Sequence, residues 1–226
     1  MFSSELYGYR SRVHAAPIIM RLSAVALTTL VGSASATTCD VYAAAGTPCV
    51  AAHSVVRSLY ASYAGPLYLV KRNLDNVIQA IGVESIGGYA NTALQDAFCG
   101  ASGCTIVQIF DQSPLGNHLG TGPPGGAGRK PDRGVNATKL PLKVGGHSVY
   151  GAYFEPGCGY RNDNTTGIAT GDEPESMYMV TSGRHYNSKC CFGASPARTH
   201  CKESRHRLAA SCVALIRLRE RRARCS

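Results

Sequence analysis

The chain has 226 residues, of which 44% are hydrophobic and 16% charged, with 25 glycines, 10 cysteines and no tryptophan. This composition excludes a collagen, a coiled coil and a polar disordered chain, and the length allows one medium-sized domain. The formal charge is +9, but residues 193–226 carry nine basic and two acidic side chains and so supply +7 of it. Because residues 37–192 are electrically balanced, we expect no nucleic-acid partner for the body of the chain.

The amino-terminal segment predicts export. From Met20 onward, Arg21 precedes a short apolar run that ends in Ala34-Ser35-Ala36. This order is typical of a secretory signal with a small-x-small cleavage site, so residues 1–36 are interpreted as a leader containing a signal peptide at 20–36. The apolar run is shorter than the ~20 residues that a membrane helix needs. We therefore expect a secreted, extracellular protein with no membrane association.

The body of the chain predicts one helix followed by strands. Apolar residues at helical spacing, Val55, Val56, Leu59, Tyr60 and Tyr63, predict a short amphipathic helix over residues 50–63. Short runs of β-branched and aromatic residues then predict strands at 67–70, 105–110, 149–154 and 177–181, separated by Gly/Pro/Asn/Asp stretches. Residues 120–134 are too rich in Gly and Pro for regular structure. The pattern as a whole is typical of an all-β sandwich.

Export determines how the cysteines are interpreted. Disulfides are the expected state in an oxidising compartment. Cys39 and Cys49 are close in sequence, as are Cys99 and Cys104, so each pair can close a small loop. The competing interpretation is zinc, but no Cys-x-x-Cys pair occurs, and we expect neither a metal nor another cofactor.

Two glycosylation sequons support the same compartment. Asn136-Ala137-Thr138 and Asn164-Thr165-Thr166 fit the acceptor pattern, which has meaning only in a secreted chain. Both asparagines, Asn136 and Asn164, are therefore predicted to lie in surface loops.

Eight ordered blocks carry a resemblance to a known family. The body resembles the catalytic domain of the secreted α-L-arabinofuranosidases of glycoside hydrolase family 54. The matching blocks are CDVYAAAGTPCVAAHS (39–54), LYLVKR (67–72), ALQDAFC (93–99), IFDQSPLGNHL (109–119), PPGG (123–126), PGCGYRN (156–162), ATGDEPESMY (169–178) and HYNSKCCF (185–192). The resemblance implies a concanavalin-like β-sandwich catalytic domain over residues 37–192, incomplete in this chain.

The resemblance also implies an activity. Its members remove terminal α-L-arabinofuranosyl residues from arabinan or arabinoxylan by a retaining mechanism, so the implied partner is an arabinose-containing plant cell-wall polysaccharide and the implied state is a monomer. It further implies disulfides joining Cys39 to Cys49, Cys99 to Cys104, and Cys190 to Cys191.

The adjacent pair Cys190 and Cys191 is the implied substrate-binding element. Neighbouring Cα atoms lie ~3.8 Å apart, below the ~4.4 Å at which ordinary disulfides begin, so a bond there strains the intervening peptide. Strain of this kind is typical of functional sites. In the family the bond forms a rigid wall of the sugar pocket. Two reduced core thiols are the alternative.

No catalytic residue is assigned. Retaining hydrolysis needs two carboxyl groups about 5 to 5.5 Å apart, and in the family both lie well beyond the Cys-Cys pair. Asp111 and the acids Asp172, Glu173 and Glu175 are the densest in the body, but turn hydrogen bonding is their expected role. His53 and His118 are likewise expected to be structural. Cys158 is left either free or paired with a cysteine of the tail.

The resemblance stops after Phe192. We interpret residues 193–226 as a basic, non-homologous tail that we expect to be disordered. Of three alternatives for its origin and role, the composition favours translation through an intron or in a wrong frame over a basic amphipathic helix or a simply disordered segment. A sandwich cut short exposes sheet edges, so we expect this chain to be poorly soluble and inactive. Two alternatives to an enzyme remain, a non-catalytic arabinose-binding remnant and a protein that interacts through its basic tail.

Overall fold

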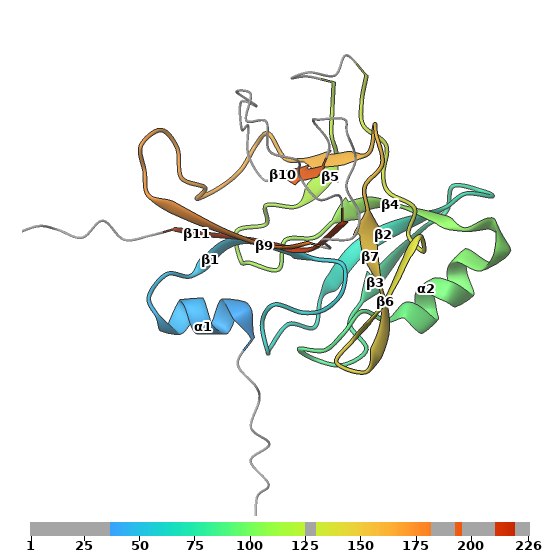
Figure 1. Ribbon diagram of the computed structural model, residues 1–226, viewed down its shortest axis with the longest axis horizontal. Helices are drawn as coiled ribbons and strands as arrows, with labels where there is room; N and C mark the ends of the chain where they lie inside the picture. Colours follow the sequence, from blue (N-terminus) through green and yellow to red (C-terminus); the bar gives the residue numbers. More distant parts are fainter. Residues whose placement is uncertain (1–36, 125–129, 182–192, 196–210, 220–226) are drawn as a thin grey trace, which may run out of the picture. The chain divides into compact units, whose positions relative to one another are not determined.

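The computed structural model describes residues 37–124, 130–181, 193–195 and 211–219 (Figure 1). In chain order its elements are α1 (Thr38–Ala44), β1 (Cys49–Ser54), β2 (Pro66–Arg72), β3 (Ile78–Gly82), α2 (Thr92–Cys99), a 3-10 turn η1 (Gly100–Ser102), β4 (Cys104–Ile109), β5 (Leu119–Thr121), β6 (Leu140–Val144), β7 (His147–Tyr153), β8 (Gly159–Arg161), β9 (Glu175–Thr181), β10 (Gly193–Ser195) and β11 (Ser211–Arg219). The all-β prediction is confirmed, and a strand overlaps each of the four segments predicted from β-branched and aromatic runs, although β4 and β7 each end one residue earlier than predicted.

One sheet has six strands in the order β10-β8-β5-β4-β2-β3. Its centre is antiparallel: β2 lies between β3 and β4, with Val70 opposite Gln79 on one side and Ile106 on the other. Asn76, at the β2–β3 turn, adopts a φ of 60°, a left-handed conformation in which Asn is enriched. The neighbouring Asp75 carboxylate accepts hydrogen bonds from the Arg72 guanidinium, which closes the hairpin.

The other sheet has five strands in the order β1-β11-β7-β6, with β9 pairing to β11 off this path. The β6–β7 hairpin turns on Gly145 and Gly146, whose φ values of 58° and 85° are both left-handed. Two such residues are what a type I′ turn requires, and glycine adopts them without steric cost. The turn therefore sets the register of the hairpin, with Val144 opposite His147.

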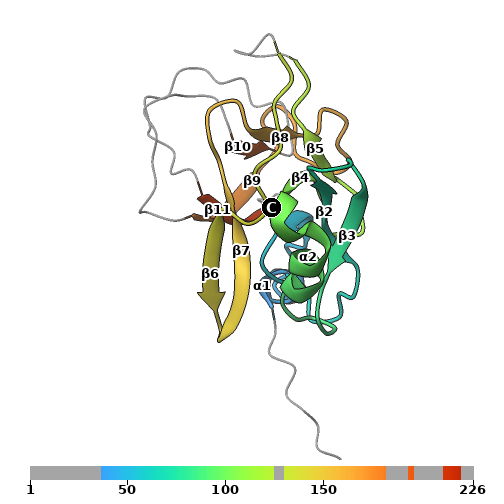
Figure 2. The same ribbon diagram turned by 90° about the vertical axis from the view of Figure 1, so that its right-hand side faces the viewer.

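The main core lies where the two sheets face each other (Figure 2). It joins Leu67 and Val70 of β2 and Ile106 of β4 to Val149 of β7, each no more than 2% exposed. The ring of Phe154 meets the ring of Tyr160 edge to face at a centroid distance of 6.0 Å. Burial of apolar side chains between two sheets is the main stabilising term of a sandwich.

The two helices are short and capped by side chains. At α1, Asp40 Oδ2 accepts hydrogen bonds from the Thr37 hydroxyl at 2.8 Å and from Ala61 N at 2.8 Å. Burial alone would raise the pKa of Asp40, but these hydrogen bonds stabilise the carboxylate and lower the pKa overall. At α2, Asn91 Oδ1 accepts from Leu94 N at 3.0 Å. No helix in the described ranges has both the length and the hydropathy to cross a membrane.

The predicted helix over residues 50–63 is wrong. Residues 49–54 form strand β1, in which every side chain is buried, and the segment after it is irregular. A short apolar run that is buried on both faces has no period of two, so spacing alone does not separate it from a helix. Ser54 Oγ accepts hydrogen bonds from Val56 N and Arg57 N, and this local turn bends the chain where the helix was expected.

Two segments of the tail differ from the expected disorder. Ser211–Arg219 forms β11, which pairs antiparallel with β1 on one side and with β9 on the other, and Gly193–Ser195 forms β10, which pairs with β8. The sequence of β11 contains an apolar run, residues 212–216, between polar residues, a pattern compatible with a central strand as well as with the helix considered above. The other residues of the tail lie outside the described part of the chain.

Candidate functional site

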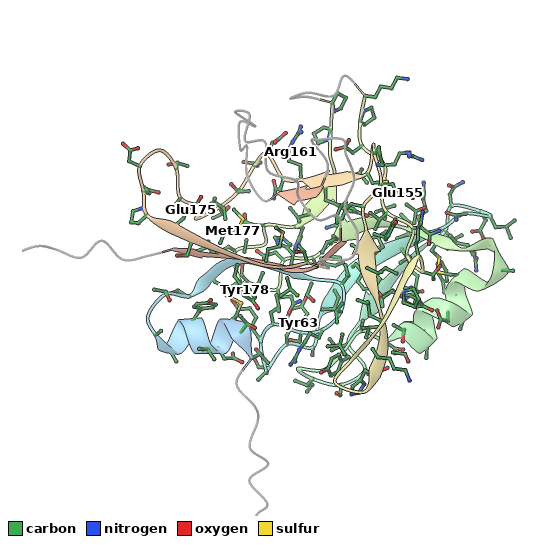
Figure 3. The ribbon with its side chains drawn as sticks, viewed as in Figure 1. Tyr63, Glu155, Arg161, Glu175, Met177 and Tyr178 are labelled. Atoms are coloured by element: carbon green, nitrogen blue, oxygen red, sulfur yellow. A yellow bond between two sulfur atoms is a disulfide. The ribbon has the colours of Figure 1, made fainter. Side chains whose placement is uncertain are left out.

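The predicted pocket wall, Cys190 and Cys191, lies outside the described residues. The last described strand before this pair in the sequence is β9, which ends at Thr181; Figure 3 labels its Glu175, Met177 and Tyr178. Four successive side chains of this strand are exposed: Met177 by 51%, Tyr178 by 43%, Met179 by 41% and Val180 by 38%. Strand β9 therefore presents apolar surface on both of its faces, which is unusual for a strand of a folded domain.

Among the acids of the described residues, Asp111 accepts the most side-chain hydrogen bonds that the structure shows. Its Oδ1 accepts from Ala52 N at 2.7 Å and from Ser113 N at 2.8 Å, and its Oδ2 accepts from Ser113 Oγ at 2.6 Å and from Asn117 N at 2.8 Å. The residue is 4% exposed. Four donors occupy the carboxylate, so it serves as a structural acceptor that holds the 111–117 loop against β1 and leaves no lone pair aimed at a substrate.

Both candidate histidines hydrogen-bond to the segment around Asp111, but only His53 is buried, whereas His118 is exposed. His53 Nε2 donates to the carbonyl oxygen of Asn117 at 2.8 Å, and His118 Nδ1 accepts from Asp111 N at 3.0 Å. Burial lowers the pKa of His53 even though the Asp111 charge and the Asn117 hydrogen bond act in the opposite direction. A neutral His53 explains why its buried Nδ1 carries no proton that would need an acceptor. Both rings are structural, as the sequence predicts.

Sequence reasoning missed Asn117, which ties three segments together. Its Nδ2 donates to Val50 O at 2.7 Å and to Thr166 O at 2.9 Å, while its Oδ1 accepts from Thr166 N at 2.7 Å. Gln112 has a similar role, since its Oε1 accepts from Leu59 N at 2.7 Å.

The sequence did contain a signal for this role: polar residues are dense within the block at 109–119, which lies between two strands. We call Asp111, Ser113, Asn117 and His53 the Asp111 cluster.

The acids of the GDEPES segment do not form a buried pair. Asp172, Glu173 and Glu175 are all exposed, and Glu175 begins strand β9. Glu173 Oε2 accepts from Thr170 N at 3.1 Å, a local contact that closes the loop. This geometry agrees with a role in turn structure.

Both disulfides that the resemblance implied within the described part of the chain are present. Cys39 is bonded to Cys49 and Cys99 to Cys104, with Cα–Cα distances of 5.7 and 5.4 Å. The first fastens α1 to the start of β1, and the second joins the end of α2 to β4. Cys158 is buried and forms no disulfide with another described cysteine, and its Sγ lies 3.6 Å from Gly134 O.

Both sequon asparagines are at the surface. Asn136 is exposed, and its Oδ1 accepts from the Thr138 hydroxyl at 3.2 Å, so the two recognition side chains of the sequon already face each other. Asn164 is exposed in the loop after β8. Their positions leave room for a glycan at either residue.

The two-sheet, disulfide-braced architecture defines an all-β sandwich of predominantly antiparallel strands, and comparisons with known proteins identify its family. A family model described as "Alpha-L-arabinofuranosidase B, catalytic" matches residues 38–209, a range that extends past Phe192. The chain belongs to this family. The fold resembles a solved arabinofuranosidase complexed with arabinofuranosyl-alpha-1,2-xylobiose, with a TM-score of 0.66 and 46% identity over 69% of this chain and 33% of that one.

Curated relatives agree with this assignment. The probable alpha-L-arabinofuranosidase B of Aspergillus fumigatus is 48% identical over 170 residues, which cover 74% of this chain and 34% of the relative. The alpha-L-arabinofuranosidase B of Aspergillus oryzae is 48% identical over 179 residues, which cover 76% and 35% respectively. The chain therefore spans about a third of the length of the curated relatives that it matches.

Proposed function

We propose that this chain contributes to a secreted glycosidase that removes terminal α-L-arabinofuranosyl residues from arabinan or arabinoxylan. One observation carries the proposal: 46% identity over 69% of the chain to a solved arabinofuranosidase that holds an arabinofuranosyl-xylobiose. The match covers 33% of that relative, so the proposal extends to the reaction class and not to the relative's whole fold. The family match over residues 38–209 supports the same reaction class.

The proposed chemistry is retaining hydrolysis, which uses one carboxylate as nucleophile and a second carboxyl group as acid, about 5 to 5.5 Å apart. Asp111 does not fit either role, because backbone and hydroxyl donors occupy both of its oxygens. Asp172, Glu173 and Glu175 do not fit either, because they lie on an exposed loop and strand end. We therefore assign neither catalytic role to an acid of the described residues.

The proposed substrate-binding element is the Cys190–Cys191 disulfide. A bond between adjacent cysteines offers a stiff, largely apolar surface against which a five-membered sugar ring can rest. Strand β9, which precedes this pair in the sequence, carries exposed apolar side chains from Met177 to Val180 that are also suited to contact with a sugar ring. Substitution of both cysteines by serine should weaken arabinose binding without unfolding the sheets.

The absence of an available carboxylate pair among the described residues favours a second candidate, an arabinose-binding protein without turnover. A paired experiment separates the two: hydrolysis of 4-nitrophenyl α-L-arabinofuranoside and of arabinoxylan is measured alongside calorimetric titration with arabinose. Release of arabinose with retention of the anomeric configuration, followed by NMR, supports the glycosidase. Binding with no release supports the second candidate. A chain that neither binds nor releases arabinose contradicts both.

Secretion and glycosylation are part of the proposal. The exposed Asn136 and Asn164 and the two disulfides support an extracellular protein. Expression of the whole chain in a secreting yeast should give medium-borne protein whose mass falls after endoglycosidase treatment. Asn136→Gln and Asn164→Gln should each remove one glycan, and retention of the unprocessed chain inside the cell would contradict this part of the proposal.

A further inference from the structure

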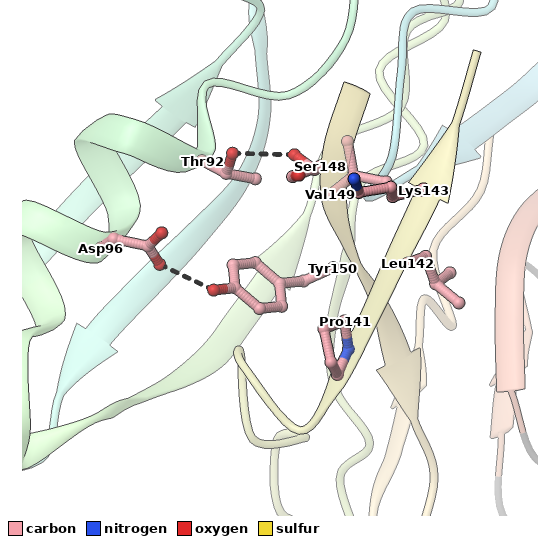
Figure 4. Close-up of a pocket in the computed structure, with 8 residues that line it drawn as sticks. All are labelled: Thr92, Asp96, Pro141, Leu142, Lys143, Ser148, Val149 and Tyr150. Atoms are coloured by element: carbon pink, nitrogen blue, oxygen red, sulfur yellow. Dashed lines mark hydrogen bonds between the residues drawn. The ribbon is translucent and has the colours of Figure 1, made fainter. Parts of the chain in front are cut away.

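A groove of about 370 Å³ lies between helix α2 and the β6–β7 hairpin (Figure 4). Ligand pockets typically begin at about 300 Å³, so this one has room for a sugar unit or two. Its walls mix apolar and polar groups: Thr92 and Asp96 come from α2, Leu142 and Lys143 from β6, and Val149 and Tyr150 from β7. None of these residues belongs to the Asp111 cluster.

Asp96 and Tyr150 face each other across the groove. The Tyr150 hydroxyl donates to Asp96 Oδ1 at 3.0 Å. Burial, this hydrogen bond and the charge of Asp96 all raise the pKa of Tyr150, so its hydroxyl stays protonated and continues to donate. Within the described ranges, Asp96 Oδ2 accepts no hydrogen bond. A carboxylate oxygen with open lone pairs beside an aromatic ring is therefore presented to solvent.

The walls of the groove are held in place before any ligand arrives. The Thr92 hydroxyl donates to Ser148 O at 2.9 Å, which joins the start of α2 to β7 at a second point. The Cys99–Cys104 disulfide fixes the other end of the helix, and Val149 is 2% exposed. A site built on fixed elements loses little conformational entropy on binding, so even modest contacts contribute to affinity.

We propose that this groove binds a pentose unit of a plant cell-wall polysaccharide. The apolar side chains and the Tyr150 ring suit the C–H face of a sugar, while Asp96 Oδ2 accepts from its hydroxyls and Lys143 donates to them. An anionic ligand does not fit, because the single lining cation, Lys143, shares the groove with Asp96. The choice of ligand class rests on the proposed function. The pentose can come from arabinosyl side chains or from the xylan backbone, which share this chemistry.

Affinity electrophoresis of the whole chain in gels containing soluble arabinoxylan, linear arabinan or unsubstituted xylan tests the proposal. The wild-type chain should be retarded, and the polysaccharide that retards it identifies the source of the pentose. Asp96→Asn and Asp96→Ala remove a charged acceptor and should weaken retardation about tenfold or more. Tyr150→Phe keeps the ring and should weaken it less. The controls are Asp163→Asn and Tyr42→Phe, which change like residues on other elements.

Each outcome of this experiment either supports or overturns the proposed pentose-binding groove. Equal retardation of the wild type and the Asp96 variants, with circular dichroism spectra unchanged, overturns the proposal, as does a wild-type chain that no polysaccharide retards. Hydrolysis of 4-nitrophenyl α-L-arabinofuranoside is measured on the same proteins to keep the two proposals apart. Loss of polymer binding on Asp96 substitution supports the groove even where no small substrate is hydrolysed. Hydrolysis with unaltered polymer binding overturns the groove alone.

Discussion

Replacement of Asp111 tests whether this acid is structural. Asp111→Ala leaves the backbone N–H groups of Ala52, Ser113 and Asn117 buried without their acceptor. Each such group costs about 1–3 kcal/mol, and after relaxation we expect a total loss of about 3–6 kcal/mol in the free energy of unfolding. Domains of this kind are stable by about 5–15 kcal/mol, so much of the chain would unfold.

The milder Asp111→Asn gives a measurable series, with every protein produced in a host that adds no N-glycans, because this change and the control below each create an Asn-x-Ser/Thr sequon. Its remaining oxygen still serves Ala52 N and Ser113 N, while its amide group faces Asn117 N, so one backbone donor is lost at a cost of about 1–3 kcal/mol. Because the chain has no tryptophan, urea unfolding is followed by far-UV circular dichroism. With a slope of about 2 kcal/mol per molar urea, a loss of 2 kcal/mol lowers the midpoint by about 1 M.

The control for this series is Asp163→Asn, in which an exposed carboxylate loses its 2.8 Å contact with Arg161 Nε. Such surface pairs contribute up to about 1 kcal/mol, so the midpoint should move little. An Asp111→Asn chain with an unchanged midpoint would refute the structural role of the carboxylate and return Asp111 to the list of candidate catalytic acids.

Three further predictions follow from single features of the fold. Burial lowers the pKa of His53, so below about pH 6.5 the unfolded chain binds a proton that the folded chain does not, and the free energy of unfolding should fall as the pH drops from 7.5 to 5.5. The variant His53→Gln should show a smaller dependence of stability on pH. An equal pH dependence of the urea midpoints of the two proteins would contradict this prediction. Loss of the Cys39–Cys49 disulfide by double serine substitution should cost about 3 kcal/mol, given a sequence separation of 10, and an unchanged thermal midpoint would count against it. Ala214 lies in β11, which pairs with β1 on one side and β9 on the other. Because proline disrupts a central strand, Ala214→Pro should remove the hydrogen-exchange protection of β1, whereas Ala214→Val should preserve it. Equal protection in the two variants would show that β1 does not depend on β11.

The sequence predicts strands well where they are bounded and alternate in burial. Strand β7 is an example over its middle residues: Val149 and Gly151 are buried while Tyr150 between them is half-buried, and two glycines stand before the strand. It fails at β1, where every residue is buried and the apolar positions imitate a helix. The missing information was tertiary, because burial on both faces is decided by the other elements of the fold rather than by the segment itself.

The Asp111 cluster could be located from the sequence but not interpreted from it. The block at 109–119 marks a polar segment, yet its hydrogen-bond partners lie about 60 residues earlier in the chain. Ala52 N donates to Asp111, and the carbonyl oxygen of Val50 accepts from Asn117. Contacts over such separations leave no periodicity in either segment. The same is true of the groove, where Tyr150 meets Asp96 across a separation of 54 residues.

The acids of this chain divide according to what occupies their oxygens. Backbone and hydroxyl donors fill Asp111, and Asp40 is used by the cap of α1, so these carboxylates contribute to the fold. Asp96 is different, because it lines the groove and the Tyr150 hydroxyl contacts only its Oδ1, which leaves its Oδ2 open to a ligand. A carboxylate that the fold does not need is available for a ligand, and hydroxyl groups of a sugar are the neutral donors that best match it. Among the described acids, an open carboxylate oxygen therefore indicates a candidate sugar-binding acid only where it also lines a groove, as at Asp96, and not on an exposed loop, as at Asp172.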